Sequence, residues 1–116
     1  CIVVADGFYE WKKEENYKTP YYFLREDKKI MYIAGIFDNN EFCLITEKAS
    51  KNLEEVHHRQ PVIVNENDVN RYLNLEFNGS FFLKECKKPI LQFYKVSKDV
   101  NKPTNNKISL IQKTNL

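Results

Sequence analysis

Short runs of aromatic and β-branched residues, each followed by turn-forming residues, fill the first half of the chain. Valine, isoleucine, tyrosine and phenylalanine favour strands, whereas Asp, Asn, Gly and charged clusters favour turns. Connections this short join antiparallel neighbours, because a parallel crossover needs roughly a dozen residues or more. We therefore expect antiparallel strands over residues 2–4, 8–12, 21–25, 30–37 and 42–46.

The second half of the chain mixes helical and strand patterns. Ser50 is suited to cap a helix, and the helical spacing of Leu53 and Val56 predicts a helix that ends before Pro61. Further along, the patterns predict a helix around 69–73, a third helical turn at 81–86, and strands at 62–64 and 90–97, before a polar loop and an apolar segment at 108–111. The expected fold class is α+β: a mainly antiparallel sheet or partial barrel with two or three short helices.

Length and composition set broad limits. The 116 residues have room for one domain, expected to span 1–116. The formal net charge of +2 excludes no class of partner, because the clustering of charge matters more than its sum. The three cysteines lack CxxC spacing, which argues against a disulfide framework or a zinc site and for a reducing compartment. No apolar run approaches the ~20 residues of a membrane helix, so we expect a cytoplasmic protein with no membrane contact.

Glu10 is the first candidate for chemistry. It lies within GFYEW at residues 7–11, and the alternation of a strand places Phe8, Glu10 and Lys12 on one face. A carboxylate held among aromatic groups can donate and accept protons in general acid–base catalysis. The alternative is an exposed strand residue that pairs with Lys12 or Lys13.

His57 is the second candidate, within HHRQP at residues 57–61. Because the predicted helix ends there, its C-terminus favours a cationic imidazole, and Arg59 offers a fork for phosphate. The alternative is a surface pair, His57 and His58, that caps the helix. Neighbouring histidines without Asp or Cys at ligand spacing do not predict a metal site, and we expect no cofactor.

Six segments, taken in their order along the chain, carry a family resemblance. They are CIVVADGFYEWKK, TPYYFL, MYIAGIF, FCLITEKAS, LEEVHHRQPVIV, and YKVSKDVN with the pair Asn105-Asn106. The combination of ADGFYEW with a later HxRxP is specific. Together these segments resemble the SRAP family, the SOS-response-associated peptidases, which act on abasic sites in single-stranded DNA.

The resemblance implies a compact, largely β fold with a positively charged cleft for single-stranded DNA. Members remove their own initiator methionine and expose an N-terminal cysteine. Its amine and thiol capture the ring-opened aldehyde of an abasic sugar as a thiazolidine, a covalent DNA–protein crosslink. By motif position, Glu10 and His57 match the family's catalytic glutamate and histidine, whereas Trp11, Thr46 and Arg59 match positions that line the DNA cleft.

The sequence also departs from the family pattern. The family's nucleophile lies in an MCGR-type start that is not found here, and Cys1 in CIVVADG matches an internal strand cysteine instead. We therefore expect the C-terminal portion of an SRAP domain, which keeps the acid–base pair and part of the cleft, with open sheet edges that favour self-association. The alternatives are a non-enzymatic module that binds single-stranded DNA and an inactive fragment.

Overall fold

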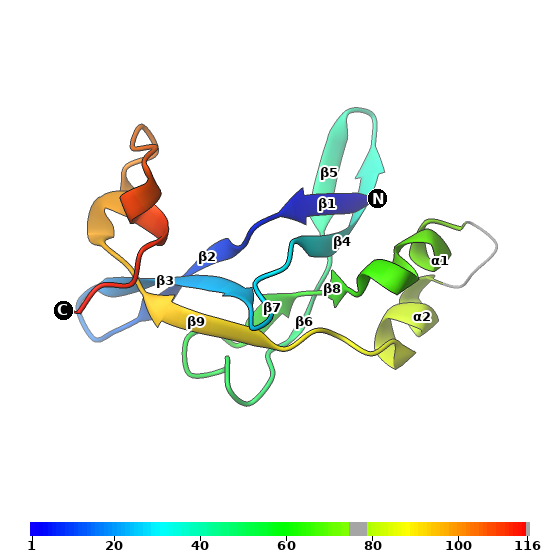
Figure 1. The fold of residues 1–116 in the computed structure, drawn as a ribbon, viewed down its shortest axis with the longest axis horizontal. Coiled ribbons are helices and arrows are strands. Elements are labelled where there is room, and N and C mark those ends of the chain that lie inside the picture. The colour runs from blue at the N-terminus through cyan, green and yellow to red at the C-terminus, as the bar shows by residue number, and fades with distance from the viewer. Residues whose placement is uncertain (75–78, 116) are drawn as a thin grey trace.

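The computed structural model describes residues 1–74 and 79–115, which form open antiparallel sheets flanked by short helical elements (Figure 1). The strands are β1 (Ile2–Ala5), β2 (Phe8–Lys13), β3 (Lys18–Arg25), β4 (Met31–Asp38), β5 (Glu41–Leu44), β6 (Thr46–Lys48), β7 (Arg59–Pro61), β8 (Ile63–Val64) and β9 (Leu91–Lys95). The helical elements are η1 (Glu66–Asp68), α1 (Val69–Leu73), α2 (Gly79–Glu85), η2 (Lys98–Asn101) and η3 (Ile108–Ile111). This arrangement confirms the α+β class, and α1 and α2 confirm the helices expected near 69–73 and 81–86.

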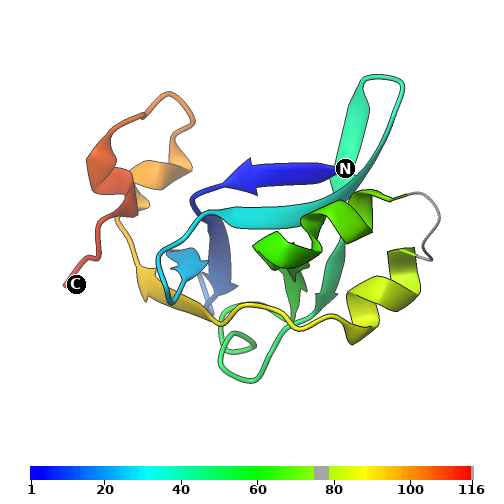
Figure 2. The same cartoon turned by 45° about the vertical axis from the view of Figure 1, so that its right-hand side comes forward.

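The first sheet is built around β4, which pairs with β1, β5 and β8. The β4–β5 hairpin projects from the body of the molecule (Figures 1 and 2). Its two connecting residues, Asn39 and Asn40, have φ values of 47° and 68°. Asparagine tolerates this left-handed region better than most residues, so the two residues form the tight turn between the strands expected over residues 30–37 and 42–46.

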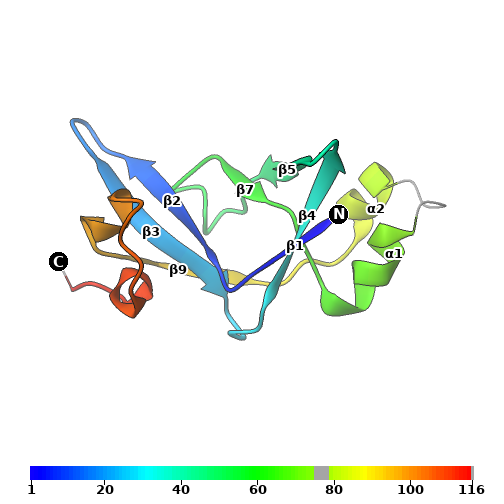
Figure 3. The ribbon, with the colours of Figure 1, turned by 90° about the horizontal axis from the view of Figure 1, so that it is seen from above.

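The second sheet has the order β2-β3-β9, and β6 pairs with β7 in a separate ribbon. Seen from above, β2 and β3 lie on one side of the molecule and β1, β4 and β5 on the other (Figure 3). Phe8 stacks on Phe23 with ring centroids 4.9 Å apart, whereas Tyr9 packs against Tyr22 at 5.4 Å on the opposite face. The alternation expected along GFYEW is therefore confirmed.

Two apolar clusters hold these elements together. The larger one joins β3, β4, β8 and β9 to the segment after β6, through Phe23, Met31, Ile33, Ala49, Leu53, Val56, Ile63 and Leu91. The smaller one seats α2 against β4 and β8, through Ala34, Val62, Val64, Phe82 and Leu83. No helix in the described ranges is both long enough and apolar enough to span a membrane.

The prediction of a helix after Ser50 is wrong, because the chain forms successive turns there. The Ser50 carbonyl accepts hydrogen bonds from the amides of Leu53 and Glu54, and the Leu53 carbonyl accepts from those of Val56 and His57. Such mixed spacing is not a regular helix, and a segment this short has little helical stability of its own. Leu53 and Val56 are nonetheless buried, so the periodicity predicted which side chains face the core.

The strand expected over residues 42–46 is interrupted. β5 ends at Leu44 and β6 begins at Thr46, because the Ile45 amide turns to the carbonyl of Ala34 on β4. Residues 59–61 form a strand that the sequence did not predict, with Pro61 at its end. A two-stranded ribbon accepts proline there because its outer edge needs no donor.

Candidate functional site

A hollow of about 700 Å³ lies between the β2–β3 hairpin, the loop of residues 49–58 and η2. It brings together three of the five candidate residues: Glu10 and Trp11 from β2 and His57 from the loop. Its complete lining is Glu10, Trp11, Lys12, Lys13, Lys18, Glu54, Glu55, Val56, His57, His58 and Asn101. Thr46 and Arg59 lie outside it.

Gly7 determines how the chain enters β2 and so where Glu10 stands. A Cβ atom at this position would lie 2.4 Å from the carbonyl oxygen of Phe23 and 2.5 Å from the ring of Tyr22. Only glycine allows such a close approach of the two strands. β2 then pairs in register with β3, which sets the half-buried Glu10 opposite Tyr21.

The Glu10 carboxylate belongs to the wall of the hollow and keeps a local hydrogen bond. Its Oε1 accepts from the backbone amide of Trp11 at 3.2 Å. This bond restrains a side chain that lines the hollow together with Lys12 and Lys13. A carboxylate restrained in this way can exchange a proton with a ligand in the hollow.

The His57 ring is held at one edge. Its Nδ1 lies 3.1 Å from both the amide nitrogen and the carbonyl oxygen of Arg59. A neutral ring accepts from that amide through Nδ1, whereas a protonated ring donates to that carbonyl. The ring also stacks on His58, with centroids 4.6 Å apart. His57 therefore keeps a partner in either protonation state, which suits a group that transfers protons.

Trp11 is oriented by a residue that the sequence did not single out. Its indole Nε1 donates to Oδ1 of Asn101 at 2.6 Å. Asn101 ends η2, far from β2 in sequence, so only the tertiary structure reveals the pair. The three lysines of the hollow were also missed as candidates, although two of them directly follow GFYEW and are visible in the sequence.

Charge is divided between the walls of the hollow. The hairpin supplies Lys12, Lys13 and Lys18, whereas the loop supplies Glu54 and Glu55. An anionic ligand is therefore attracted to the hairpin wall and repelled by the loop wall.

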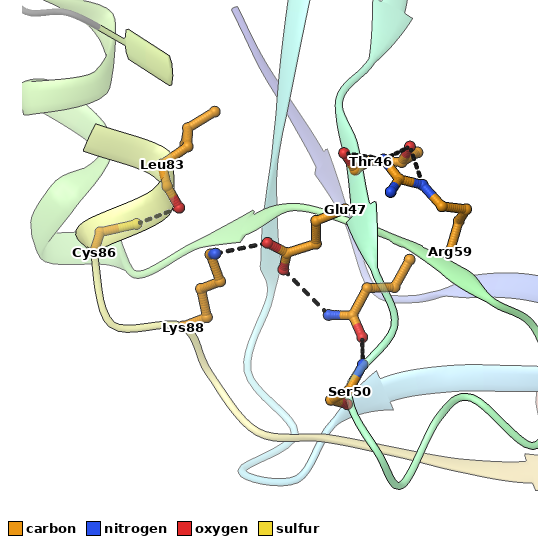
Figure 4. Close-up of polar contacts among 8 residues, drawn as sticks. Thr46, Glu47, Ser50, Arg59, Leu83, Cys86 and Lys88 are labelled. Atoms are coloured by element: carbon orange, nitrogen blue, oxygen red, sulfur yellow. Dashed lines mark hydrogen bonds and ion pairs between the residues drawn. The ribbon is translucent and has the colours of Figure 1, made fainter. Parts of the chain in front are cut away.

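Arg59 and Thr46 form a separate exposed pair on the β6–β7 ribbon (Figure 4). Nη2 of Arg59 donates to the Thr46 carbonyl at 2.8 Å and to its Oγ1 at 3.1 Å, and Nε also reaches Oγ1 at 3.3 Å. The planar guanidinium is thereby fixed, with its outer edge available for an anionic group.

Cys1 lies away from the hollow. Its amino group donates to the carbonyl of Gly35 at 2.8 Å, which extends the β1–β4 ladder. A Cβ at Gly35 would lie 3.1 Å from the Cys1 sulfur, so the thiol occupies the space that glycine leaves. Within residues 1–74 and 79–115, no cluster of three His, Cys, Asp or Glu side chains could hold a metal ion.

Comparisons with known proteins identify a family and several relatives that the chain is similar to. The profile of the SOS response associated peptidase (SRAP) family matches residues 1–103. The chain is 32% identical to the abasic site processing protein YMR114C of Saccharomyces cerevisiae, over 97% of this chain and 34% of that protein. It is 29% identical to the abasic site processing protein YoqW of Bacillus subtilis, over 97% of this chain and 56% of that protein.

The fold has a counterpart among solved structures. A crystal structure of a Bacteroides thetaiotaomicron protein matches with a TM-score of 0.83 and 26% identity, over 98% of this chain and 56% of that one. The chain thus spans between about a third and just over half of the length of these relatives. Because the family profile covers most of its residues, this chain belongs to the SRAP family.

Proposed function

We propose that the chain acts in the processing of abasic sites in single-stranded DNA, and that the hollow holds the damaged strand. One observation carries this proposal: Glu10, Trp11 and His57 line the same hollow beside three lysines. The two curated relatives described above are named as abasic site processing proteins, which supports the same function.

Each side chain has a role in this proposal. The lysines attract the phosphates, and Trp11 offers a ring on which an unpaired base can stack, worth ~1–3 kcal/mol per base. His57 moves a proton between sugar oxygens as the abasic sugar opens to its aldehyde. Glu10 accepts a proton as an amine attacks that aldehyde and then donates one as water leaves.

The nucleophile in this proposal is the N-terminal cysteine of the family, which closes a thiazolidine on the aldehyde. We do not assign this role to Cys1, because its amine is bonded to Gly35 and its residue does not line the hollow. The chain described here then contributes DNA binding and proton transfer to the domain.

The test uses a fluorescently labelled single strand with one abasic site and the matching intact strand. We expect salt-sensitive binding that prefers the abasic strand and that falls in His57→Ala. Glu10→Gln should reduce that preference, whereas Glu15→Gln, at an exposed position of the same hairpin, should not. Binding that ignores both salt and the abasic site would contradict the proposal.

A denaturing gel of the same mixtures tests the assignment of the nucleophile. We expect no crosslinked band from this chain. A band that disappears in Cys1→Ser would show that Cys1 is the nucleophile after all.

The exposed pair of Arg59 and Thr46 favours a second candidate, a non-enzymatic module that binds single-stranded DNA. Arg59 presents a fixed guanidinium outside the hollow. This alternative predicts an affinity for single-stranded DNA that falls in Arg59→Ala or Trp11→Ala. In Glu10→Ala, both the affinity and the full preference for the abasic strand should be retained.

The β4–β5 hairpin supports a further element of the proposal, self-association. Ile36, Phe37 and Phe42 are 58%, 72% and 62% exposed. Apolar surface of this kind marks a contact site. Sedimentation should show concentration-dependent association, and a strictly monomeric protein would contradict it. The proposed location is the cytoplasm, since Cys1, Cys43 and Cys86 are all free thiols.

A further inference from the structure

We infer that Gln60 is a positioning residue for His57, because its side chain ties the loop of residues 49–58 to a chain of polar contacts that ends at Lys88. The geometric part of this inference is independent of the proposed function, whereas its consequence for DNA binding rests on that function.

The contacts run through four residues (Figure 4). Lys88 Nζ lies 2.6 Å from Oε2 of Glu47. Gln60 Nε2 donates to Oε1 of the same carboxylate at 3.4 Å, and its own Oε1 accepts from the backbone amide of Ser50 at 2.8 Å. One side-chain amide therefore connects the start of the loop to an ion pair.

The ribbon register makes this chain of contacts possible. Glu47 on β6 stands directly opposite Gln60 on β7. Directly opposed residues on neighbouring strands have adjacent side chains. The Glu47 and Lys88 side chains are 26% and 25% exposed, so water screens their attraction less than it does at the open surface. While position 47 holds a carboxylate, position 60 needs an amide, since that side chain must donate to the carboxylate and accept from an N–H at once.

Two hydrogen bonds, here called ties, close the base of the loop, which we call its neck. The first tie joins the Ala49 amide to the His58 carbonyl at 3.0 Å, and the second joins the Ser50 amide to Oε1 of Gln60. His57 directly precedes the residue that closes the first tie, and Glu54 and Glu55 lie on the same loop. Release of the second tie therefore displaces the loop wall of the hollow, including the imidazole.

The test compares three variants by NMR spectroscopy and by affinity for the abasic-site strand. Gln60→Met keeps the length of the side chain and removes both contacts. Gln112→Met makes the same change at an exposed position that belongs neither to the loop nor to the β6–β7 ribbon and is the control. The double variant Glu47→Gln with Gln60→Glu exchanges the two groups, so that position 60 again accepts from Ser50 and position 47 donates to it.

We expect Gln60→Met to move the Ser50 amide proton upfield, to shift the ring signals of His57 and to weaken DNA binding about fivefold, the effect of one lost hydrogen bond. Gln112→Met should change none of these. The exchanged pair should restore the Ser50 signal, the His57 signals and the affinity, which a merely destabilised loop would not do.

Two results would overturn the inference. One is a Gln60→Met spectrum in which Ser50 moves while the His57 ring signals stay in place. The other is a lower melting temperature with unchanged His57 signals below the transition, which would make Gln60 a stabilising residue only. If Gln60→Met does not fold, Lys88→Met serves in its place, because it removes the outer end of the chain of contacts and should produce a smaller shift of the same signals. Unchanged His57 and Ser50 signals in Lys88→Met would also contradict the inference. A wild-type protein that fails to bind DNA would refute the proposed function, while the imidazole signals would still decide this inference.

Discussion

The indole nitrogen of Trp11 and the side-chain oxygen of Asn101, 90 residues apart, share a hydrogen bond of 2.6 Å. This bond fastens the η2 turn to β2 and sets the angle at which the Trp11 ring faces the hollow. The neighbouring contact of Trp11 with the Tyr9 ring, at 6.4 Å, constrains the indole from the same strand. An aromatic platform that is fixed before binding loses little rotational freedom when a base stacks on it.

Asn101→Ala should therefore weaken the binding of single-stranded DNA by about threefold to tenfold, the range expected for one lost hydrogen bond to a binding group. Trp11 is the single tryptophan of the chain, so intrinsic fluorescence reports directly on its surroundings. We expect a shifted emission maximum in the free variant and smaller quenching by a short oligonucleotide.

Asn106→Ala is the matched control for that experiment, because it makes the same substitution on an exposed residue nearby that does not line the hollow. Its emission and affinity should equal those of the wild type. If Asn101→Ala leaves both the emission and the quenching unchanged, the Trp11 orientation does not depend on Asn101.

Arg59 provides a second prediction, on salt dependence. Replacement by alanine should lower the slope of log affinity against log salt by roughly one, since one phosphate contact disappears. Thr46→Val removes the two bonds to Oγ1 but leaves the bond to the Thr46 carbonyl, so we expect a weaker affinity with an unchanged slope. Titrations at several salt concentrations distinguish the two effects, and an unchanged slope in Arg59→Ala would remove this residue from the interface.

The sequence predicted much of the β structure because alternation and turn chemistry are local signals. The strand containing Glu10 and the hairpin turn at Asn39 and Asn40 follow from neighbouring residues alone. The turns after Ser50 do not, since the hydrogen bonds at the neck of the loop come from Gln60 and His58. The helical spacing of Leu53 and Val56 predicted correctly that both side chains are buried, because a series of turns can bury residues at the same spacing as a helix.

The same distinction separates the residues of the site. Motifs in the sequence identified Glu10, Trp11 and His57 as candidates. Only the structure shows that the three residues line one hollow. Asn101 and Gln60 act through partners distant in sequence, Trp11 and Ser50, and no local pattern marks such pairs. Sequence reasoning reached the groups suited to chemistry and missed those that hold them in place.

Gly7→Ala tests the entry into β2. The new methyl group would stand 2.4 Å from the Phe23 carbonyl oxygen. That oxygen belongs to the backbone of β3, so it cannot easily move away. We expect a loss of about 3 kcal/mol in the free energy of unfolding, at the upper end for overpacking. Urea denaturation measures this change, and Gly79→Ala is the control, because its nearest atom outside the helix lies at 3.8 Å. Equal stabilities of the two variants would contradict the close approach.

Burial raises the pKa values of Tyr9, Tyr22 and Tyr94 above the ordinary value for tyrosine. The folded state thus favours the neutral phenols, and their stabilising contribution is complete below the unfolded pKa of about 10 and is lost as the pH rises through the folded values. The contribution of these phenols to the free energy of unfolding should stay level between about pH 7 and pH 9 and fall above about pH 10.

Tyr94→Phe separates the hydrogen bond from the titration. The phenol donates to the Ile111 carbonyl, so its removal should cost about 1 kcal/mol near pH 8. The decline above pH 10 should be shallower than in the wild type because one titrating group is gone. An equally steep decline in the variant would show that Tyr94 contributes nothing to the alkaline transition.

Leu53→Ala tests whether the loop that carries His57 depends on the core beneath it. Leu53 is 3% exposed and packs with Val56 in the larger cluster, so truncation should lower the free energy of unfolding by about 2–5 kcal/mol. Leu73→Ala, at a position 47% exposed, should change it far less. Because the ties at the neck of the loop remain, the His57 ring signals should move less in Leu53→Ala than in Gln60→Met at temperatures below the transition. Larger shifts in Leu53→Ala would mean that core packing, rather than the polar contacts of Gln60, fixes the imidazole.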